Sequence, residues 1–121
     1  GRDLEFYQTQ YQLLQARSLA ERVARQLRLA SNDAFFAAHG IDPDERVLFS
    51  DRVGPQTSTD RQRREKLAVK ALLEHISISP IRGSALVDVS YSSASPELAA
   101  QVANMWTQQF ILQSMDRRFA S

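Results

Sequence analysis

Apolar residues recur at the spacing of an α-helix through most of the chain. Two stretches, residues 3–16 and 17–29, each carry one apolar stripe. The stripe is formed by Leu4, Tyr7, Tyr11 and Leu14 in the first stretch and by Leu19, Val23 and Leu27 in the second. Such stripes are typical of amphipathic helices, so we expect both to pack in the core. The alternative for the first helix is that its Gln-rich face meets a partner. Ser18 and Glu21 fit the S-x-x-E capping box and predict that the second helix begins there.

Shorter segments follow these two helices. Residues 31–40 predict a short helix that buries Phe35 and Phe36 and ends at a glycine. Residues 41–58 contain proline and glycine without a clear period, which predicts a mobile loop. Within that loop, residues 46–49 fit either a brief strand or a helical turn. Residues 59–76 regain the helical period, with a stripe formed by Val69, Leu72, Leu73 and Ile76.

The pattern then changes to a period of two. Residues 76–79 and 87–91 alternate β-branched or aromatic residues with polar ones, which predicts two strands. Pro80 and Gly83 lie between them and favour an antiparallel hairpin over about residues 76–91. From Pro96 onward the helical period returns, and its apolar positions are Leu98, Val102, Met105, Trp106, Phe110 and Leu112. A long C-terminal helix is therefore expected from about residue 96, with Ser95 as its N-cap.

These elements together predict an α+β fold in which a small antiparallel sheet packs against several helices. The length of 121 residues suits one domain. Two strands alone rarely form a stable sheet. We therefore expect a third strand, supplied by residues 46–49, by a segment upstream of residue 1, or by another chain. Residues 1–121 are accordingly expected to be a fragment of a larger domain.

Composition excludes several classes of function. The net charge of +1 does not indicate a nucleic-acid or membrane-surface partner. The chain has no cysteine, which excludes a disulfide scaffold, a thiol nucleophile and a Cys-ligated zinc site. No apolar run approaches the roughly 20 residues that a membrane-spanning helix needs.

Two groups of arginines are candidates for contacts between subunits. Arg22, Arg25 and Arg28 lie along one face of the second predicted helix. Arg61, Arg63 and Arg64 crowd the first turns of a later helix, where the helix dipole disfavours cations. Carboxylates on a neighbouring subunit would compensate these charges. The alternative is that both groups are simply solvated.

Recognisable catalytic patterns are absent from the sequence. It contains no Gly-rich phosphate loop, no H-E-x-x-H and no G-x-S-x-G. His39 and His75 lie in different segments without ligand spacing, and we expect each at a surface or a helix end. Trp106 is expected in the core, with a sugar-stacking surface as the alternative. No catalytic residue, cofactor site or metal site is predicted, and the Ser95-Pro96-Glu97 turn is interpreted as architectural.

Two stretches carry a resemblance to a known family. "FYQTQYQLLQARSLAERVARQLRL" in residues 6–29 and "ISISPIRGSALVDVSYSSASPELAAQVANMW" in residues 76–106 are similar to motifs of the polysaccharide chain-length determinant (Wzz-type) and exopolysaccharide co-polymerase family. The two stretches together cover about half of the chain, in the expected order. Ser95 stands where the family usually has Asp, and both residue types cap helices.

The resemblance implies a location, a set of partners and a function. The chain would be the membrane-proximal periplasmic α/β domain of an inner-membrane protein, with flanking membrane spans outside this chain. It would control exopolysaccharide chain length and export, without catalysis, through a homo-oligomer that works with a polymerase and the export machinery. The polysaccharide itself is a further candidate partner. Any tyrosine kinase activity would lie in a separate cytoplasmic domain. The alternative function is a soluble carbohydrate-binding module that uses Trp106.

Overall fold

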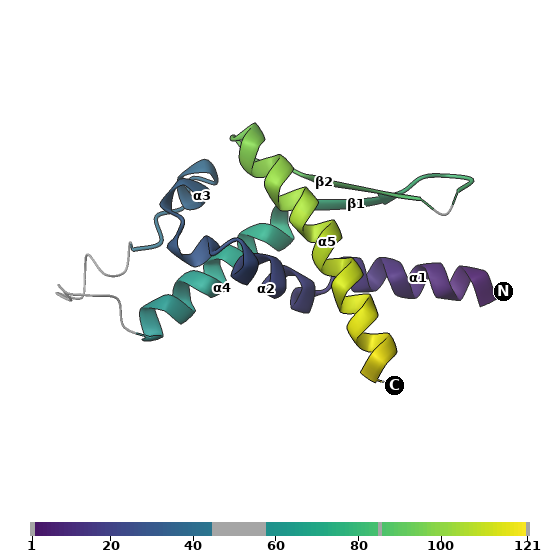
Figure 1. Cartoon of the computed structure of the whole chain (residues 1–121). Helices are drawn as coiled ribbons and strands as arrows, with labels where there is room; N and C mark the ends of the chain where they lie inside the picture. The colour runs from purple at the N-terminus through teal and green to yellow at the C-terminus, as the bar shows by residue number, and fades with distance from the viewer. Residues whose placement is uncertain (1, 45–57, 85, 121) are drawn as a thin grey trace.

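A computed structural model describes residues 2–44, 58–84 and 86–120, and within them the side chains of residues 4–44, 60–84 and 86–118. These residues form an α+β fold that is mainly helical (Figure 1). The elements are, in order, α1 (Arg2–Leu14), α2 (Arg17–Gln26), the 3-10 turn η1 (Leu29–Ser31), α3 (Asp33–Ala38), α4 (Ser58–His75), β1 (Ile76–Pro80), β2 (Val87–Tyr91) and α5 (Pro96–Ala120). The predicted hairpin and the predicted long helix from about residue 96 are both confirmed.

Helix α2 lies at the centre of the core, where it packs against both α4 and α5. Its stripe is buried, as predicted for Leu19 and Val23, and the neighbouring alanines Ala20 and Ala24 are buried with it. Alanine brings little volume to a packed interface, so it lets the two flanking helices approach α2 closely. The remaining core side chains come mostly from α3, α4 and α5, namely Phe35, Phe36, Ala68, Val69, Ala71, Leu72, Val102 and Trp106.

The predicted start of α2 is wrong. The helix begins at Arg17, its N-cap is Ala16, and no side chain caps it. The Ala16 carbonyl accepts hydrogen bonds from the amides of Leu19 and Ala20, and only two residues separate α2 from the end of α1. Ser18 therefore lies inside the first turn, where its hydroxyl accepts a hydrogen bond of 3.4 Å from Gln113 of α5. A capping residue must precede the first helical residue, so Ser18 cannot serve as one here.

Strands β1 and β2 form an antiparallel hairpin whose register runs from the pair Ile76–Tyr91 to the pair Pro80–Val87. Burial decreases along it: Ile78 and Tyr91 are buried near the helices, whereas Val87 near the turn is exposed. Among the described residues the sheet has two strands. Residues 46–49, one predicted source of a third strand, lie outside the described residues. So does most of the predicted mobile loop at residues 41–58, of which only 41–44 and 58 are described.

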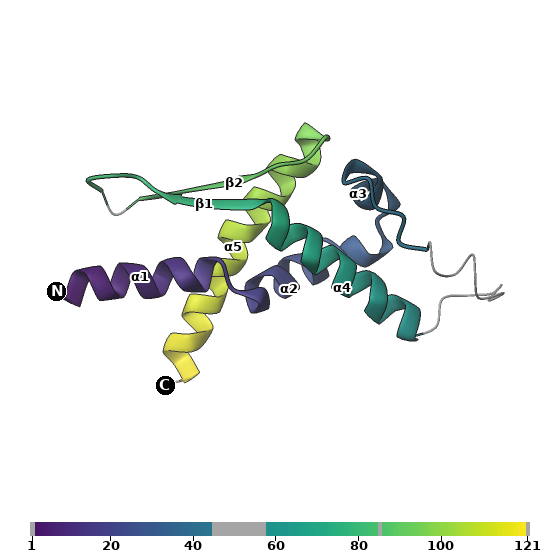
Figure 2. The same ribbon diagram turned by 180° about the vertical axis from the view of Figure 1, so that it is seen from behind.

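Helix α1 is only half in the core, which corrects the prediction that its whole stripe is buried. Leu14 is buried and Tyr11 partly so, but the side chains of Leu4 and Tyr7 are 61% and 49% exposed. Two hydrogen bonds hold the inner end of the helix: the Tyr11 hydroxyl donates to the Ile78 carbonyl at 2.8 Å, and Trp106 Nε1 donates to the Leu14 carbonyl at 2.7 Å. Figures 1 and 2 show α1 and the hairpin extending from the helical core in the same direction.

The turn from β2 into α5 is made by short polar side chains. The Ser95 amide donates to Ser93 Oγ at 3.1 Å, and Ser95 Oγ accepts the Leu98 amide at 3.3 Å, so Ser95 is the predicted N-cap of α5. Pro96 is the first helical residue. The N–H at this position has no partner within the helix, so its absence in proline costs no helical hydrogen bond. The polar groups of this turn are used to redirect the chain, which agrees with an architectural role.

Replacing the cap tests this role directly. Ser95→Ala should lower the free energy of unfolding by about 1 kcal/mol, because the Leu98 amide loses its acceptor. Ser95→Asn, which restores an acceptor at the same position, should lie within about 0.5 kcal/mol of the native protein. Urea unfolding followed by far-ultraviolet circular dichroism measures both changes. Equal stability of the two variants would show that Ser95 Oγ does not act as the cap.

Candidate functional site

The three arginines predicted along one face of the second helix have different surroundings. Arg22 is tied to α5, since its Nε donates to Gln109 Oε1 at 3.2 Å and its Nη1 to Asp116 at 3.2 Å. Arg25 is exposed in the last turn of α2. Arg28 lies beyond the helix, in the left-handed region with φ of 52°. The helix ends at Gln26, so the three residues do not form one continuous basic helix face.

The second group of arginines is divided between the interior and the surface. Arg61 is exposed, and Arg63 is partly buried with its Nη2 3.8 Å from carboxyl oxygens of both Asp44 and Asp60. The side chain of Arg64 is 3% exposed. Its burial removes Arg64 from the set of candidate interface residues.

Arg64 is held entirely by groups of the same chain. Its Nε donates to the Ala30 carbonyl at 2.6 Å, its Nη2 to Asp33 at 2.6 Å, and its Nη1 to both carboxyl oxygens of Asp44 at 3.0 Å. Its guanidinium also lies 5.2 Å from the ring centre of Phe36. Burial alone would lower the pKa of Arg64, but the hydrogen bonds to Asp33 and Asp44 outweigh it and raise that pKa. A charged Arg64 therefore joins α4 to α3 and its flanking turns.

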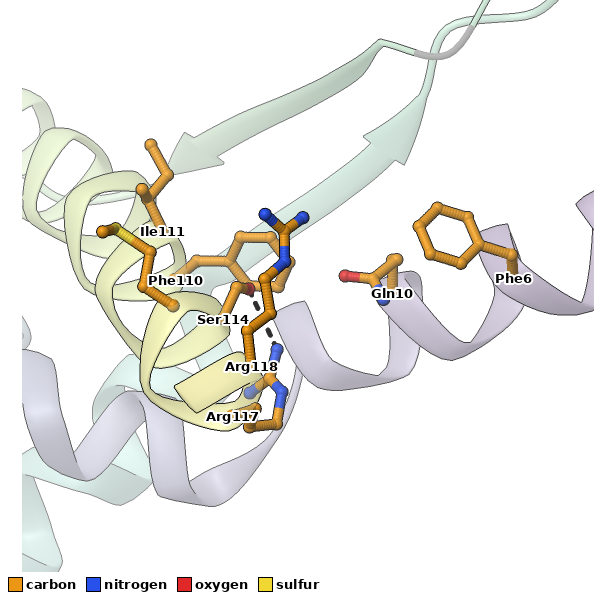
Figure 3. A pocket seen from close by; sticks show the side chains of 8 residues that line it. Phe6, Gln10, Phe110, Ile111, Ser114, Arg117 and Arg118 are labelled. Carbon is orange, nitrogen blue, oxygen red and sulfur yellow. Dashed lines mark hydrogen bonds between the residues drawn. The ribbon is translucent and has the colours of Figure 1, made fainter. Parts of the chain in front are cut away.

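A surface groove between α1 and α5 was not predicted. Figure 3 shows Phe6 and Gln10 of α1 facing the second half of α5, where Arg117 donates a hydrogen bond to Ser114 at 3.0 Å. The groove is lined mostly by apolar side chains, together with two arginines. Its lining residues on α5 are Phe110, Ile111, Ser114, Met115, Arg117 and Arg118.

The groove includes the exposed apolar side chains of Phe6, Ile111 and Met115, which we call the α1–α5 surface. Leu4, Tyr7 and Leu112 are exposed on the same two helices but do not line the groove. Each of these side chains is between 43% and 61% exposed. Large apolar patches on a soluble surface mark sites of interaction. The signal for part of this surface was present in the sequence: Phe110, Ile111 and Leu112 are consecutive, so they cannot all face one side of a helix.

The two histidines, predicted to be unrelated helix-end residues, lie against each other. Their ring centres are 4.4 Å apart with an interplanar angle of 37°. His39 follows α3 and His75 ends α4, so each does lie at a helix end. His39 Nε2 is 2.8 Å from the Tyr91 hydroxyl. No spacing rule predicts this contact, because packing of α3 against α4 and β2 creates it. In the part of the chain that the structure describes, no group of three or more His, Cys, Asp or Glu is arranged to hold a metal ion.

Trp106 lies in the core, as predicted, and is fully buried. Its indole N–H donates a hydrogen bond to the Leu14 carbonyl. A sugar-stacking surface needs an exposed ring face, so Trp106 does not provide one in this structure. The carbohydrate-binding alternative thereby loses the residue on which it was based.

Comparison with protein-family models, with curated proteins and with solved structures gave no match. The described helices were also compared with the length and hydropathy that a bilayer requires. None of them is both long enough and apolar enough to cross a membrane.

Proposed function

We propose that this chain is a non-catalytic assembly domain, the periplasmic part of an inner-membrane polysaccharide co-polymerase that controls exopolysaccharide chain length and export. The proposal combines the resemblance of residues 6–29 and 76–106 with one structural observation. That observation is the α1–α5 surface, where the large apolar side chains of Phe6, Ile111 and Met115 are exposed along a groove between two helices. Such a surface suits a domain that becomes buried in a larger assembly.

The arrangement of the hairpin and α5 also favours an assembly role. The first half of α5 is fixed in the core by Val102 and Trp106, and Ser95 caps its start. The second half extends past the core with Ile111, Leu112 and Met115 exposed. A helix anchored at one end and apolar at the other can position a neighbouring subunit without any chemical step.

The direct test is made in the organism that encodes the protein. Deletion of the gene should change the size distribution of its exopolysaccharide, and the full-length gene should restore it. Size-exclusion chromatography of the purified polymer measures the distribution. Unchanged polymer length and amount after deletion would refute the proposed function.

A second prediction concerns assembly through the α1–α5 surface. In the full-length protein, the double substitution Ile111→Ser and Met115→Ser should shift the particle mass in detergent toward smaller species, because two exposed apolar contacts are lost. Gln101→Ser with Gln108→Ser, two exposed positions on the same helix, is the matched control and should leave the mass unchanged. An identical mass in all three proteins, measured by mass photometry, would exclude this surface from the assembly.

The exposed arginines give a further test of subunit contacts. Charge reversal at Arg25, Arg28 or Arg61 is expected to weaken assembly if carboxylates of a neighbouring subunit face them. Lys70→Glu on α4 is the control, since Lys70 is exposed and outside both arginine groups. Arg22, Arg63 and Arg64 are unsuitable for this test, because each has carboxylate partners within its own chain. Assembly that withstands all three reversals would remove the arginines from the interface.

A further inference from the structure

We infer that His39, His75 and Tyr91 form an acid-sensitive clasp, which holds the end of α3 against α4 and β2 at neutral pH and loosens it when an imidazole gains a proton. The clasp is independent of the proposed function. It rests on the contact of two histidine rings at 4.4 Å and on the 2.8 Å hydrogen bond between His39 and Tyr91.

The hydrogen bonds define which atoms carry protons in the closed form. His75 Nδ1 lies 2.8 Å from the Ala71 carbonyl. A carbonyl only accepts, so Nδ1 of His75 carries a proton. The Tyr91 hydroxyl is 2.8 Å from His39 Nε2 but 3.5 Å from the Ala71 carbonyl. The shorter contact favours donation from Tyr91 to an unprotonated Nε2 of His39, which makes His39 neutral.

Protonation of His39 disturbs this arrangement. A proton on Nε2 turns that nitrogen into a donor, so the Tyr91 hydroxyl has to accept and needs a new acceptor for its own proton. The nearest one is the Ala71 carbonyl, which is 3.5 Å away and already accepts from His75. The acidic form thus reverses the 2.8 Å hydrogen bond and leaves the Tyr91 proton with only the 3.5 Å contact, and a poorly paired donor in a partly buried place is unfavourable.

The charged and titratable groups around His39 come from the two elements packed against α3. Helix α4 contributes His75 and Glu74, and strand β2 contributes Tyr91. Burial lowers the pKa of His39, and the nearby His75 lowers it further, whereas Glu74 raises it by a smaller amount. Burial raises the pKa of the Tyr91 hydroxyl, so Tyr91 keeps its proton over the same range. At the other end of α3, Asp33 is paired with Arg64.

The lowered pKa of His39 determines the direction in which pH shifts the opening of α3. When α3 opens, His39 returns toward its ordinary pKa of about 6.5 and binds a proton more readily than in the closed form. Opening is therefore favoured as the pH falls below about 6.5, and the effect is complete below the pKa of the closed form. Each pKa unit between the two forms increases the opening equilibrium about tenfold.

The amides that report on opening are those of His39, Gly40 and Ile41, which donate to carbonyls of α3. Hydrogen exchange followed by nuclear magnetic resonance at pH 7.5 and pH 5, corrected for intrinsic exchange rates, should show their protection reduced at least severalfold in acid. The amides of Val23 and Val102 in the buried helices are the controls and should keep their protection. Equal protection of the three reporter amides at both pH values would overturn the inference, as would an equal loss throughout the chain.

Titration of the two imidazoles tests whether the neighbours of His39 shift its pKa. The chain has two histidines, so their ring proton resonances can be assigned by comparison with one variant. His75→Gln should raise the titration midpoint of His39, and Glu74→Gln should lower it, because the first removes a positive neighbour and the second a negative one. Lys70→Gln, a matched loss of charge on the exposed side of α4, should leave it unchanged. A His39 midpoint at or above 6.5 in the native protein, or one that does not move in His75→Gln, would refute the clasp.

Discussion

Trp106→Ala is expected to lower the free energy of unfolding by about 3–5 kcal/mol, which would leave a domain of this size close to unfolding. Trp106 is fully buried, so removal of the indole leaves a large cavity where α5 meets the rest of the core. The variant also loses the 2.7 Å bond from Nε1 to the Leu14 carbonyl. That carbonyl belongs to the last turn of α1, where helical hydrogen bonds are missing.

Two further substitutions separate the contributions to this loss. Trp106→Phe keeps an aromatic ring but removes the N–H donor, and should cost about 1–3 kcal/mol because a buried carbonyl stays unpaired. Ile111→Ala on the same helix should cost less than about 0.5 kcal/mol, since Ile111 is exposed. Urea unfolding monitored by circular dichroism suits all three proteins, because it does not depend on the single tryptophan. If Trp106→Ala were as stable as Ile111→Ala, α5 would not be anchored in this way.

Arg64→Met is expected to lower the free energy of unfolding by about 2–4 kcal/mol. Methionine fills a similar space and can be buried, so the variant removes the polar contacts with little loss of packing. The cost lies mainly with the groups that stay in the interior, the Ala30 carbonyl and the face of Phe36. The carboxylate of Asp33 is 87% exposed, so water can solvate it once the guanidinium is gone.

The same geometry predicts an asymmetry between the two partners of this ion pair. Asp33→Asn should cost no more than about 1 kcal/mol, because the amide oxygen still accepts from Arg64 and Asp44 keeps its two contacts. The cost of Arg64→Lys should lie between those of Arg64→Met and Asp33→Asn, since lysine keeps the charge but cannot donate to three separate groups in fixed directions. Arg61→Met at the exposed surface is the control. Arg64→Met with native stability, measured by urea unfolding, would contradict the role assigned to this side chain.

The elements that a local pattern determines could be predicted from the sequence. The hairpin follows from the period-two alternation before Tyr91, and the start of α5 follows from Ser95 and Pro96. Phe35 and Phe36 were correctly placed in the core because a short helix has little else to bury. In each case the structure is determined by residues that are close to one another in the sequence.

The features that depend on distant segments could not be predicted. Helical spacing shows that Leu4 and Tyr7 share a face, but it does not show whether another element covers that face. The hydrogen-bond partners of Arg64 lie 20, 31 and 34 positions away in the sequence, so its charge resembled that of an exposed arginine. The contact between His39 and His75 likewise appears only when α3 packs against α4.

The bond from Trp106 to the Leu14 carbonyl has a consequence for biosynthesis. The two residues are 92 positions apart, so the ribosome has to add at least 92 residues after Leu14 before this bond can form. Until then, α2 lacks the helix that covers one of its sides, and its buried stripe stays exposed to other nascent chains and to chaperones. Closing so long a loop costs only slightly more entropy than closing a short one. The delay is therefore one of translation time, and slow translation of the codons between those for Leu14 and Trp106 should lower the yield of folded protein.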